Sequence, residues 1–210
     1  MKKKEKMLSV LEILKKLYGS RVLDSLKKND QFRILIGAIL SQRTRDENTA
    51  KAVKRLFSAV THPQDILKLD EEELQRLIKP SGYYRQKTKK IKKLCEILTD
   101  SYGGRVPERR EELLHLPGVG PKTADVVLCY GFNRPQIPID IHVEVCSKRL
   151  GLVRKNARYE EIRETLESLT SIEDRQIVNL GLVRFGREFC RTRYPKCRIC
   201  PMNHFCNHYG

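Results

Sequence analysis

The sequence contains no apolar run that approaches the roughly 20 residues needed to span a bilayer. Its basic beginning does not read as a signal peptide, because Glu12, Lys15 and Lys16 interrupt the apolar positions and no small-residue cleavage site follows. The chain also lacks a repeat of fixed period and any low-complexity tract. These absences argue against a membrane protein, a secreted protein and a repeat array. We expect an intracellular globular protein that is a monomer by default.

Acidic residues are too few to balance the basic ones. The chain has 42 Lys and Arg against 26 Asp and Glu, which leaves a formal net charge of +16. An excess of this size indicates a polyanion as partner, and nucleic acid is the first candidate. The basic residues are spread along the chain instead of forming one tail, so a basic surface without a specific partner is the alternative. Motifs must separate the two.

Signals for β-strands are also scarce. Apolar residues recur at intervals of three and four almost everywhere, as in 7–14, 91–98 and 159–169, and 40% of all residues are apolar. Only the segment PQIPID, 135–140, reads as extended, because its two prolines exclude a helix. We interpret that segment as a linker. The predicted fold class is all-α, with about ten short helices separated by Gly- and Pro-rich turns.

A tight turn is predicted inside 108–131, between two helical patterns. Pro121 suits the first turn of the second helix, where a missing N–H does no harm. Gly118 and Gly120 permit backbone angles closed to other residues, and their lack of side chains lets a foreign backbone approach the helix N-terminus. The turn therefore predicts a phosphate-binding site, with an ordinary helix connection as the alternative.

A nucleotide-binding P-loop is a rival interpretation of the same turn, since GPKT nearly reproduces its G-K-[ST] ending. Pro121, however, separates the glycine from Lys122, and His115 stands where the first glycine of the motif should be. A charged helix, not a strand, precedes the turn. ATP is therefore not the expected ligand.

The cysteines number seven, an odd count that does not suit a disulfide framework. Cys95, Cys129 and Cys146 stand alone in apolar patterns and read as core residues. The other four occur within 190–206, in the spacing C-x6-C-x2-C-x5-C. They are Cys190, Cys197, Cys200 and Cys206. Zinc sites normally use two C-x-x-C pairs and this segment has one, so the spacing favours an iron-sulfur cluster and leaves zinc as the alternative.

The combination of these segments resembles the endonuclease III branch of the helix-hairpin-helix DNA glycosylases. The resemblance covers nearly the whole chain and is carried, in order, by ILIGAILSQRTRDENTAKAV, LIKPSGYYRQKTKKI, LPGVGPKTADVVL, IPIDIHV and the cysteine cluster. It implies two helical domains that flank a DNA-binding cleft. One is a central bundle, 24–133, that contains the hairpin motif at about 108–131. The other combines 1–23 with 134–210 and carries the cluster loop 190–206.

The chemistry that the resemblance implies depends on Lys122 and Asp140. Lys122 stands where the family carries its amine nucleophile, and its place beside the positive end of a helix dipole is expected to lower its pKa. Asp140 matches the carboxylate that assists loss of the base and stabilises the cationic sugar. The alternatives are a solvated phosphate contact for Lys122 and, for Asp140, an N-cap of a helix that begins at Ile141.

The resemblance also implies residues that occupy the gap left by a flipped base. Gln42 or Arg43 would hydrogen-bond to the widowed partner base, and Tyr83 would stack between its neighbours as a wedge. The alternatives are a polar helix cap for the first two residues and a half-buried core aromatic for the third. The predicted DNA-binding residues are Gln42, Arg43, Tyr83, Gly118, Val119 and Gly120.

The implied function is bifunctional base excision repair. Lys122 would attack the sugar C1′ to expel a damaged base, such as an oxidised pyrimidine, and β-elimination would then nick the abasic strand. The implied cofactor is a 4Fe-4S cluster on the four clustered cysteines. The implied partner is double-stranded DNA with damaged bases or abasic sites, in the cytoplasm at the nucleoid or in the nucleus.

Three other functions remain as alternatives. The first is a mismatch-type glycosylase. The adenine-specific kind is disfavoured, because such relatives place a glutamate where Ala38 stands and lack the lysine, but the pair in GYY recurs in mismatch-specific relatives. The second is a DNA-damage-binding iron-sulfur protein without catalysis, and the third is an electron-transfer protein. The second does not require Lys122 and Asp140 at their observed spacing, and the third is weakened because a single cluster stands beside a hairpin motif and only charge suggests a docking partner.

Overall fold

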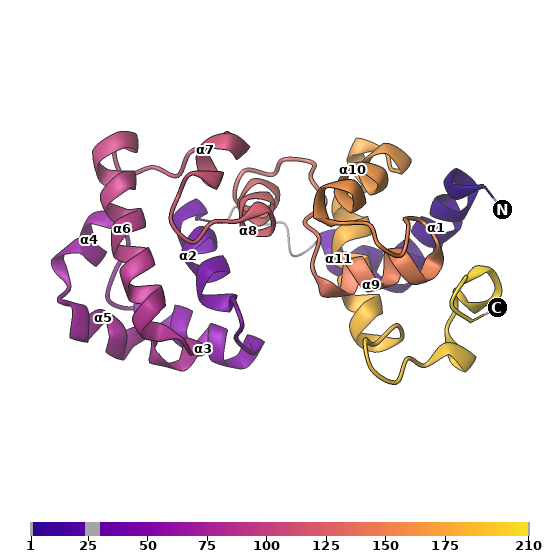
Figure 1. The fold of residues 1–210 in the computed structure, drawn as a ribbon, viewed down its shortest axis with the longest axis horizontal. Coiled ribbons are helices and arrows are strands. Elements are labelled where there is room, and N and C mark those ends of the chain that lie inside the picture. The colour runs from indigo at the N-terminus through magenta and orange to yellow at the C-terminus, as the bar shows by residue number, and fades with distance from the viewer. Residues whose placement is uncertain (1, 24–29, 210) are drawn as a thin grey trace. The chain divides into compact units, whose positions relative to one another are not determined.

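The computed structural model describes residues 2–23 and 30–209, and every regular element within these ranges is a helix (Figure 1). The predicted all-α class is therefore confirmed. The chain divides into two compact units, one of Lys28–Asn133 and one that joins Met1–Lys27 to Arg134–Gly210. The predicted domain boundary after residue 23 falls beside a segment that lies outside the described residues. Within the described ranges, no helix combines the length and apolarity needed to cross a membrane.

The unit Lys28–Asn133 is a bundle of short helices. In chain order these are α2 (Gln31–Ser41), α3 (Asp46–Leu56), α4 (Pro63–Lys68), α5 (Glu71–Ile78), the 3-10 helix η1 (Lys79–Ser81), α6 (Tyr84–Tyr102), α7 (Arg110–Leu114), α8 (Pro121–Val126) and the π-helix η2 (Val127–Gly131). Two of these helices have an aspartate as N-cap residue. Asp30 accepts hydrogen bonds from the first backbone N–H groups of α2, and Asp70 accepts one from Glu73 N in α5 at 2.7 Å.

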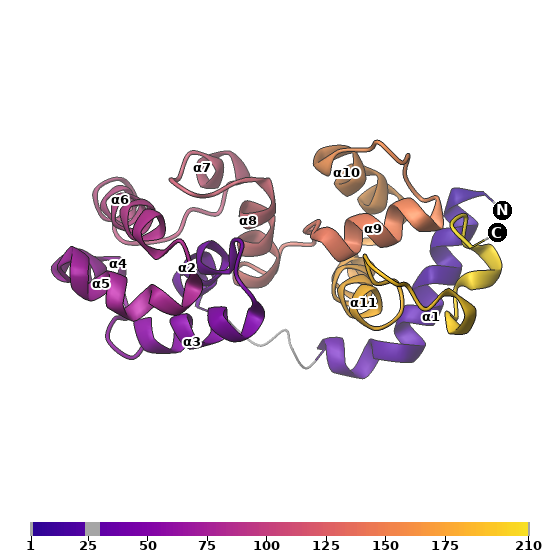
Figure 2. The same ribbon diagram turned by 60° about the horizontal axis from the view of Figure 1, so that its bottom comes forward.

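The core of this unit forms around α6, which packs against α4 and α5 (Figure 2). The stripe predicted on α6 is confirmed, because Ile91, Leu94, Cys95 and Leu98 are all fully buried. Burying each aliphatic side chain contributes about 1.5–3 kcal/mol. Burial also raises the pKa of the Cys95 thiol to about 12, which makes it an unreactive core residue, as expected.

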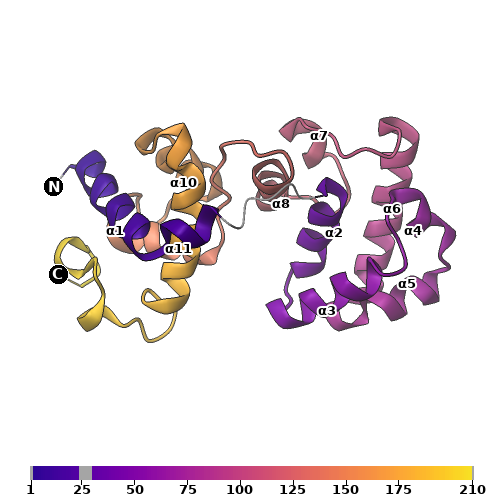
Figure 3. The ribbon, with the colours of Figure 1, turned by 180° about the vertical axis from the view of Figure 1, so that it is seen from behind.

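The second unit is built on α11 (Arg175–Glu188), which packs against α1 (Lys3–Leu23) and α9 (Ile141–Leu150) (Figures 2 and 3). Gly181 permits the close approach of α1 and α11, because a Cβ there would lie 3.1 Å from atoms of Leu14. The predicted stripe of α1 faces this contact and is buried. The remaining elements are α10 (Tyr159–Leu169), η3 (Ile172–Asp174), η4 (Cys197–Ile199) and η5 (Asn203–Phe205).

The segment 135–140 has no regular structure, as expected, but it is more than a linker. Ile137 and Ile139 are buried in the core of the second unit. Their N–H groups donate to Glu167 Oε1 at 3.1 Å and to the Tyr159 hydroxyl at 3.3 Å. The segment therefore follows the boundary between the two units, as a linker does, but it is also packed in the second unit and hydrogen-bonded by side chains of α10. This packing fixes the backbone that leads to Asp140.

Candidate functional site

The predicted hairpin consists of α7, the turn 115–120 and α8. A buried ion pair joins its two arms, since Arg110 Nε lies 2.7 Å from Oδ1 of Asp125. The Asp125 side chain is fully buried and that of Arg110 is 20% exposed. Removing one partner of a buried pair costs about 3 kcal/mol or more, because the other charge is left uncompensated. The two arms are therefore held in a fixed relation on either side of the turn.

The two glycines of the turn differ in their backbone. Gly118 has a φ of +82°, a region that favours glycine, as expected. Gly120 has a φ of −105° and a ψ of −179°, which any residue adopts, so the expectation of a special backbone angle at this position was wrong. A Cβ on Gly120 would meet no atom within 4 Å, so the turn is open to the outside at this point.

Val119 is the residue between them, and its side chain is buried in the core of the unit. Its N–H donates to Leu116 O at 3.1 Å within the turn. The Val119 side chain therefore shapes the turn from within the core. The role of this residue in binding DNA stays a prediction. Lys122 follows as the second residue of α8, and its side chain is exposed.

Gln42 connects the hairpin to the end of α2. Its side-chain Nε2 donates to Gly118 O at 2.8 Å and lies 3.4 Å from the Thr123 hydroxyl. Its backbone N–H donates to Ile39 O, so Gln42 is also the C-cap of α2. The alternative of a helix cap thus holds for its backbone, while its side chain ties the loop after α2 to the glycine turn.

Arg43 and Tyr83 share an uncommon backbone conformation. Their φ angles are 53° and 45°, in the left-handed region that residues with a side chain rarely adopt. Tyr83 is 59% exposed, so the alternative of a half-buried core aromatic is wrong. Both residues line one hollow together with Gln42 and with side chains of α6. The structure thus brings together all three residues predicted to occupy the gap left by a flipped base.

Asp140 is the N-cap of α9. Its Oδ1 accepts hydrogen bonds from His142 N at 2.9 Å and Val143 N at 2.8 Å, which confirms the capping alternative. Both of these bonds use Oδ1, and Oδ2 lies outside the cap. Asp140 belongs to the unit that contains Arg134–Gly210, whereas Lys122 belongs to Lys28–Asn133. Their joint action therefore stays a prediction.

The four clustered cysteines line a single cavity. They are Cys190, Cys197, Cys200 and Cys206. Within the described ranges, no group of three His, Cys, Asp or Glu side chains is close enough together to hold one metal ion. The argument for a bound cluster therefore rests on the cavity that the four cysteines share and on the chemistry of their thiols. Four thiol sulfurs around one cavity are the donor set of an iron-sulfur cluster.

Arg149 holds the start of the cluster loop, and the sequence pattern did not single it out. Its Nη1 donates to Arg191 O at 2.7 Å and its Nη2 to Thr192 O at 3.1 Å. The same guanidinium lies 3.6 Å from Cys190 Sγ. The neighbouring buried Cys146 thiol, together with the Arg149 guanidinium, lowers the pKa of the Cys190 thiol. Thiolate character of this kind suits a metal ligand.

Comparison with known proteins agrees with this geometry. The chain belongs to the HhH-GPD superfamily of base excision DNA repair proteins, whose family model matches residues 36–171. Within the superfamily it falls in the endonuclease III branch. It is 47% identical to endonuclease III of Thermotoga maritima over 183 residues, which make up 87% of this chain and 85% of the relative. The resemblance predicted from the motifs is therefore confirmed.

Solved structures support the same assignment. The structure of a trapped covalent intermediate of endonuclease III with DNA matches with a TM-score of 0.91 at 37% identity, and covers 100% of this chain and 98% of that one. The structure of a thermostable thymine-DNA glycosylase matches with a TM-score of 0.81 at 29% identity, over 94% of this chain and 97% of that one. This protein is thus a base excision DNA repair enzyme.

The two glycines of the turn should respond differently to the same substitution. Gly118→Ala should lower the free energy of unfolding by about 1–2 kcal/mol, because alanine is strained at positive φ. Gly120→Ala should change it by no more than about 0.5 kcal/mol, since the backbone there is ordinary. Denaturant unfolding of both variants measures the difference. Equal losses would contradict the assignment of backbone strain to Gly118 alone.

Proposed function

We propose that this protein is a bifunctional DNA glycosylase and abasic-site lyase that removes damaged bases, oxidised pyrimidines above all, from double-stranded DNA. The observation that supports this most strongly is the match along the full chain to a covalent endonuclease III-DNA intermediate. A covalent intermediate requires a nucleophile on the protein. Lys122 is the candidate here, because it is an exposed amine in the first turn of α8, directly after the glycine turn.

The proposed reaction uses Lys122 as nucleophile. The lone pair of its neutral amine attacks C1′ of a nucleotide that has left the base stack, and the bond from C1′ to the base breaks with its electrons on the base. Ring opening of the sugar gives a Schiff base between Nζ and C1′. Loss of a proton from C2′ then expels the 3′ phosphate by β-elimination, which nicks the strand.

Asp140 supplies the carboxylate in this proposal. Because Oδ1 is held by two backbone N–H groups, the side chain has a fixed orientation. Oδ2 is then the oxygen that stabilises the positive charge developing on the sugar as the base leaves. The packed segment 137–139 holds the backbone of Asp140 in place. Structural capping and chemistry thus use different oxygens of one side chain.

Gln42, Arg43 and Tyr83 are proposed to stabilise the DNA after the base has left. Tyr83 is exposed and aromatic, so it can stack in the vacated space. Gln42 keeps its amide nitrogen on the glycine turn and offers Oε1 to the unpaired base, while the Arg43 guanidinium offers donors. An exposed tyrosine at this place and the likeness to a thymine-DNA glycosylase make a mismatch-type activity the second candidate.

The cysteines of the loop 190–206 are proposed to hold a 4Fe-4S cluster. Cys190, Cys197, Cys200 and Cys206 would be its four ligands, and the cluster would organise the loop without taking part in bond breaking. Arg191, Arg193, Lys196 and Arg198 on this loop are exposed. They form a basic surface for DNA phosphates.

The nucleophile can be tested by trapping. Incubated with an abasic duplex and borohydride, the protein should form a covalent adduct with DNA. Both Lys122→Ala and Lys122→Arg should lose the adduct, because neither side chain forms a Schiff base that borohydride can reduce. The arginine variant keeps the positive charge and should still bind DNA. An adduct of undiminished yield with Lys122→Arg would show that Lys122 contacts phosphate and does not attack the sugar.

Asp140→Asn separates capping from catalysis. Asparagine caps helices as well as aspartate does, so thermal stability should not change. Base release in a single turnover should fall at least about a hundredfold, because the negative charge is lost. Asp70→Asn makes the same change at the N-cap of α5 and should leave the rate unaltered. If Asp140→Asn releases bases at the wild-type rate, the carboxylate has no part in the reaction.

The cofactor can be tested by absorbance. Protein purified without oxygen should show a broad band at about 400 nm, which is typical of iron-sulfur clusters. Cys200→Ala should lose most of the band, and Cys95→Ala, which alters a buried cysteine of the other unit, should keep it. If the wild-type protein contains bound zinc and shows no such band, the four cysteines form a zinc site and the assignment of a cluster is wrong.

A further inference from the structure

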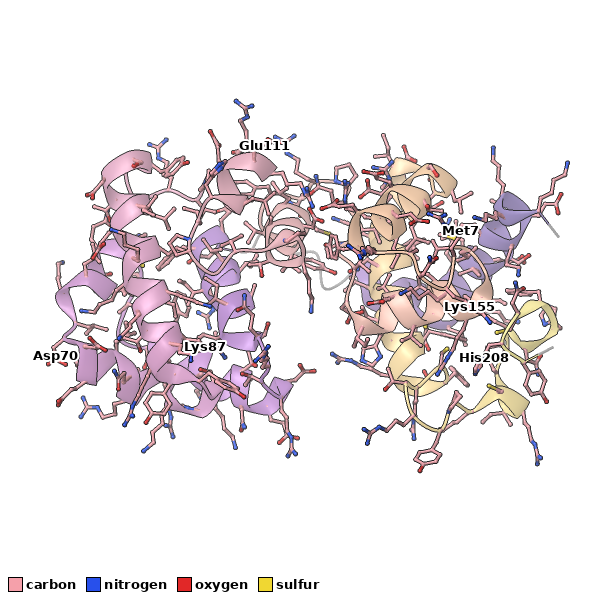
Figure 4. The ribbon with its side chains drawn as sticks, in the orientation of Figure 1. Met7, Asp70, Lys87, Glu111, Lys155 and His208 are labelled. Atoms are coloured by element: carbon pink, nitrogen blue, oxygen red, sulfur yellow. The ribbon has the colours of Figure 1, made fainter. Side chains whose placement is uncertain are left out.

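Lys87 is, with Lys6, one of two buried lysines among the described residues of this basic chain. Lys87 lies on α6 (Figure 4) and is only 5% exposed. It shares the buried face of this helix with Ile91 and Leu94. Burial lowers the pKa of its amine to about 8, so it still carries its charge at neutral pH. A charge at this depth requires partners that replace water.

Three oxygens provide those partners. Lys87 Nζ donates to Leu40 O at 2.7 Å, to Ser81 O at 2.8 Å and to the Thr44 hydroxyl at 2.9 Å. The Thr44 hydroxyl in turn donates to Ser81 O. All three N–H bonds of the ammonium are therefore used, and none of the acceptors is itself charged.

These acceptors lie in or beside two separate loops. Leu40, in the last turn of α2, and Thr44, in the connection from α2 to α3, flank Gln42 and Arg43. Ser81 is the last residue of η1 and precedes the short connection to α6 that contains Tyr83. Lys87 thus bridges the two loops that carry the residues proposed to enter DNA. Two of the three acceptors are backbone carbonyls, so these bonds restrain the backbone itself.

The strained backbones of these loops need such a constraint. Arg43 and Tyr83 both have positive φ, and a residue with a side chain keeps this conformation only where its surroundings enforce it. Arg43 directly precedes Thr44, and Tyr83 lies two residues after Ser81. The bonds to Lys87 are therefore placed to enforce both conformations at once.

We propose that Lys87 is a positioning residue that clamps the two loops, so that Gln42, Arg43 and Tyr83 meet the DNA duplex as a preformed wedge. This inference rests on the proposed function. Without the clamp, Leu40 O loses the ammonium donor and Ser81 O keeps only the Thr44 hydroxyl. The loops then gain freedom that must be lost again when the wedge enters the base stack. Lys87 itself touches no reacting atom. Its removal should slow base removal from a duplex and spare chemistry that needs no stack to be opened.

The test compares two substrates for each variant. One is a duplex with a single oxidised pyrimidine, in which base excision is followed in a single turnover. The other is a single-stranded abasic oligonucleotide, on which borohydride trapping reports Lys122 alone. Lys87→Met should excise from the duplex roughly tenfold more slowly, since small displacements of a positioning group have effects of this order or larger. Its trapping on the single strand should match that of the wild type.

Lys92→Met is the matched control. Lys92 also lies on α6 and donates from Nζ to a carbonyl, Leu69 O at 2.5 Å, but Leu69 belongs to neither loop. This variant should keep both activities, even if it lowers the melting temperature. A general loss of stability in the bundle is thereby separated from a loss of loop position.

Thr44→Val carries the same test if Lys87→Met does not fold. It removes the hydroxyl between Lys87 and Ser81 with little change of shape, and leaves the ammonium two carbonyl partners. The duplex rate should fall less than in Lys87→Met, again without change on the single strand. A duplex containing 2-aminopurine opposite the lesion gives an independent signal, because its fluorescence changes when the wedge is inserted. This change should be slowest in Lys87→Met, intermediate in Thr44→Val and fastest in the wild type.

The outcomes are distinguishable. A lower duplex rate with unchanged single-strand trapping supports the clamp. Parallel losses on both substrates, or a duplex rate equal to that of Lys92→Met, overturn it and leave Lys87 as an ordinary structural lysine. A wild-type protein that neither excises the base from the duplex nor is trapped on the single strand overturns the proposed function, and this inference with it.

Discussion

The constraint on which this structure depends is the pairing of backbone groups at helix ends. Each helix leaves N–H groups at its start and carbonyls at its end without partners inside the helix. A chain cut into many short helices has many such ends, and an end that does not face water needs a partner from a side chain or from elsewhere in the backbone. Two side chains proposed to act on DNA, those of Asp140 and Gln42, also bond to backbone groups in this way.

Three residues illustrate this overlap. Asp140 satisfies the first N–H groups of α9. Gln42 donates to the carbonyl of Gly118 in the turn before α8. Lys87 donates to the carbonyl of Leu40 near the end of α2. In each case a structural bond fixes the direction in which a reactive or contacting group points, so the same polar atoms that complete the helices also preorganise the site.

The sequence predicts the part of this arrangement that is local. Periodic apolar residues predict the buried face of α6. The aspartate before Ile141 predicts an N-cap, whose more distant donor, Val143 N, is only three residues away. The Lys87 bonds are different, because Leu40 lies 47 positions away and a carbonyl leaves no trace in the residue type. One signal was nevertheless present. Lys87 stands four residues before Ile91, on the apolar stripe of a helix whose other lysines fall elsewhere.

Backbone conformation was the other feature beyond local prediction. A glycine in a turn indicates a positive φ, yet the φ of Gly120 is negative. Arg43 and Tyr83 have positive φ although they carry side chains. The segment PQIPID shows the same limit, because its prolines indicate an irregular chain but not that Ile137 and Ile139 are buried. In both cases tertiary packing decides what the residue type leaves open.

Strain and exposure at the two loops have a common consequence. A non-glycine residue at positive φ costs of the order of 1–3 kcal/mol, and an exposed tyrosine forgoes the free energy of burial. The free protein therefore carries two unfavourable features where Arg43 and Tyr83 meet. If these loops relaxed in the absence of DNA, the same conformation would have to be regained during each insertion, and the barrier to base flipping would rise accordingly. Lys87, in the first turn of α6, holds the two loops in this conformation before DNA binds. The free energy that the conformation costs is then offset by the burial of the apolar stripe of α6 on folding, and does not add to the barrier of the reaction.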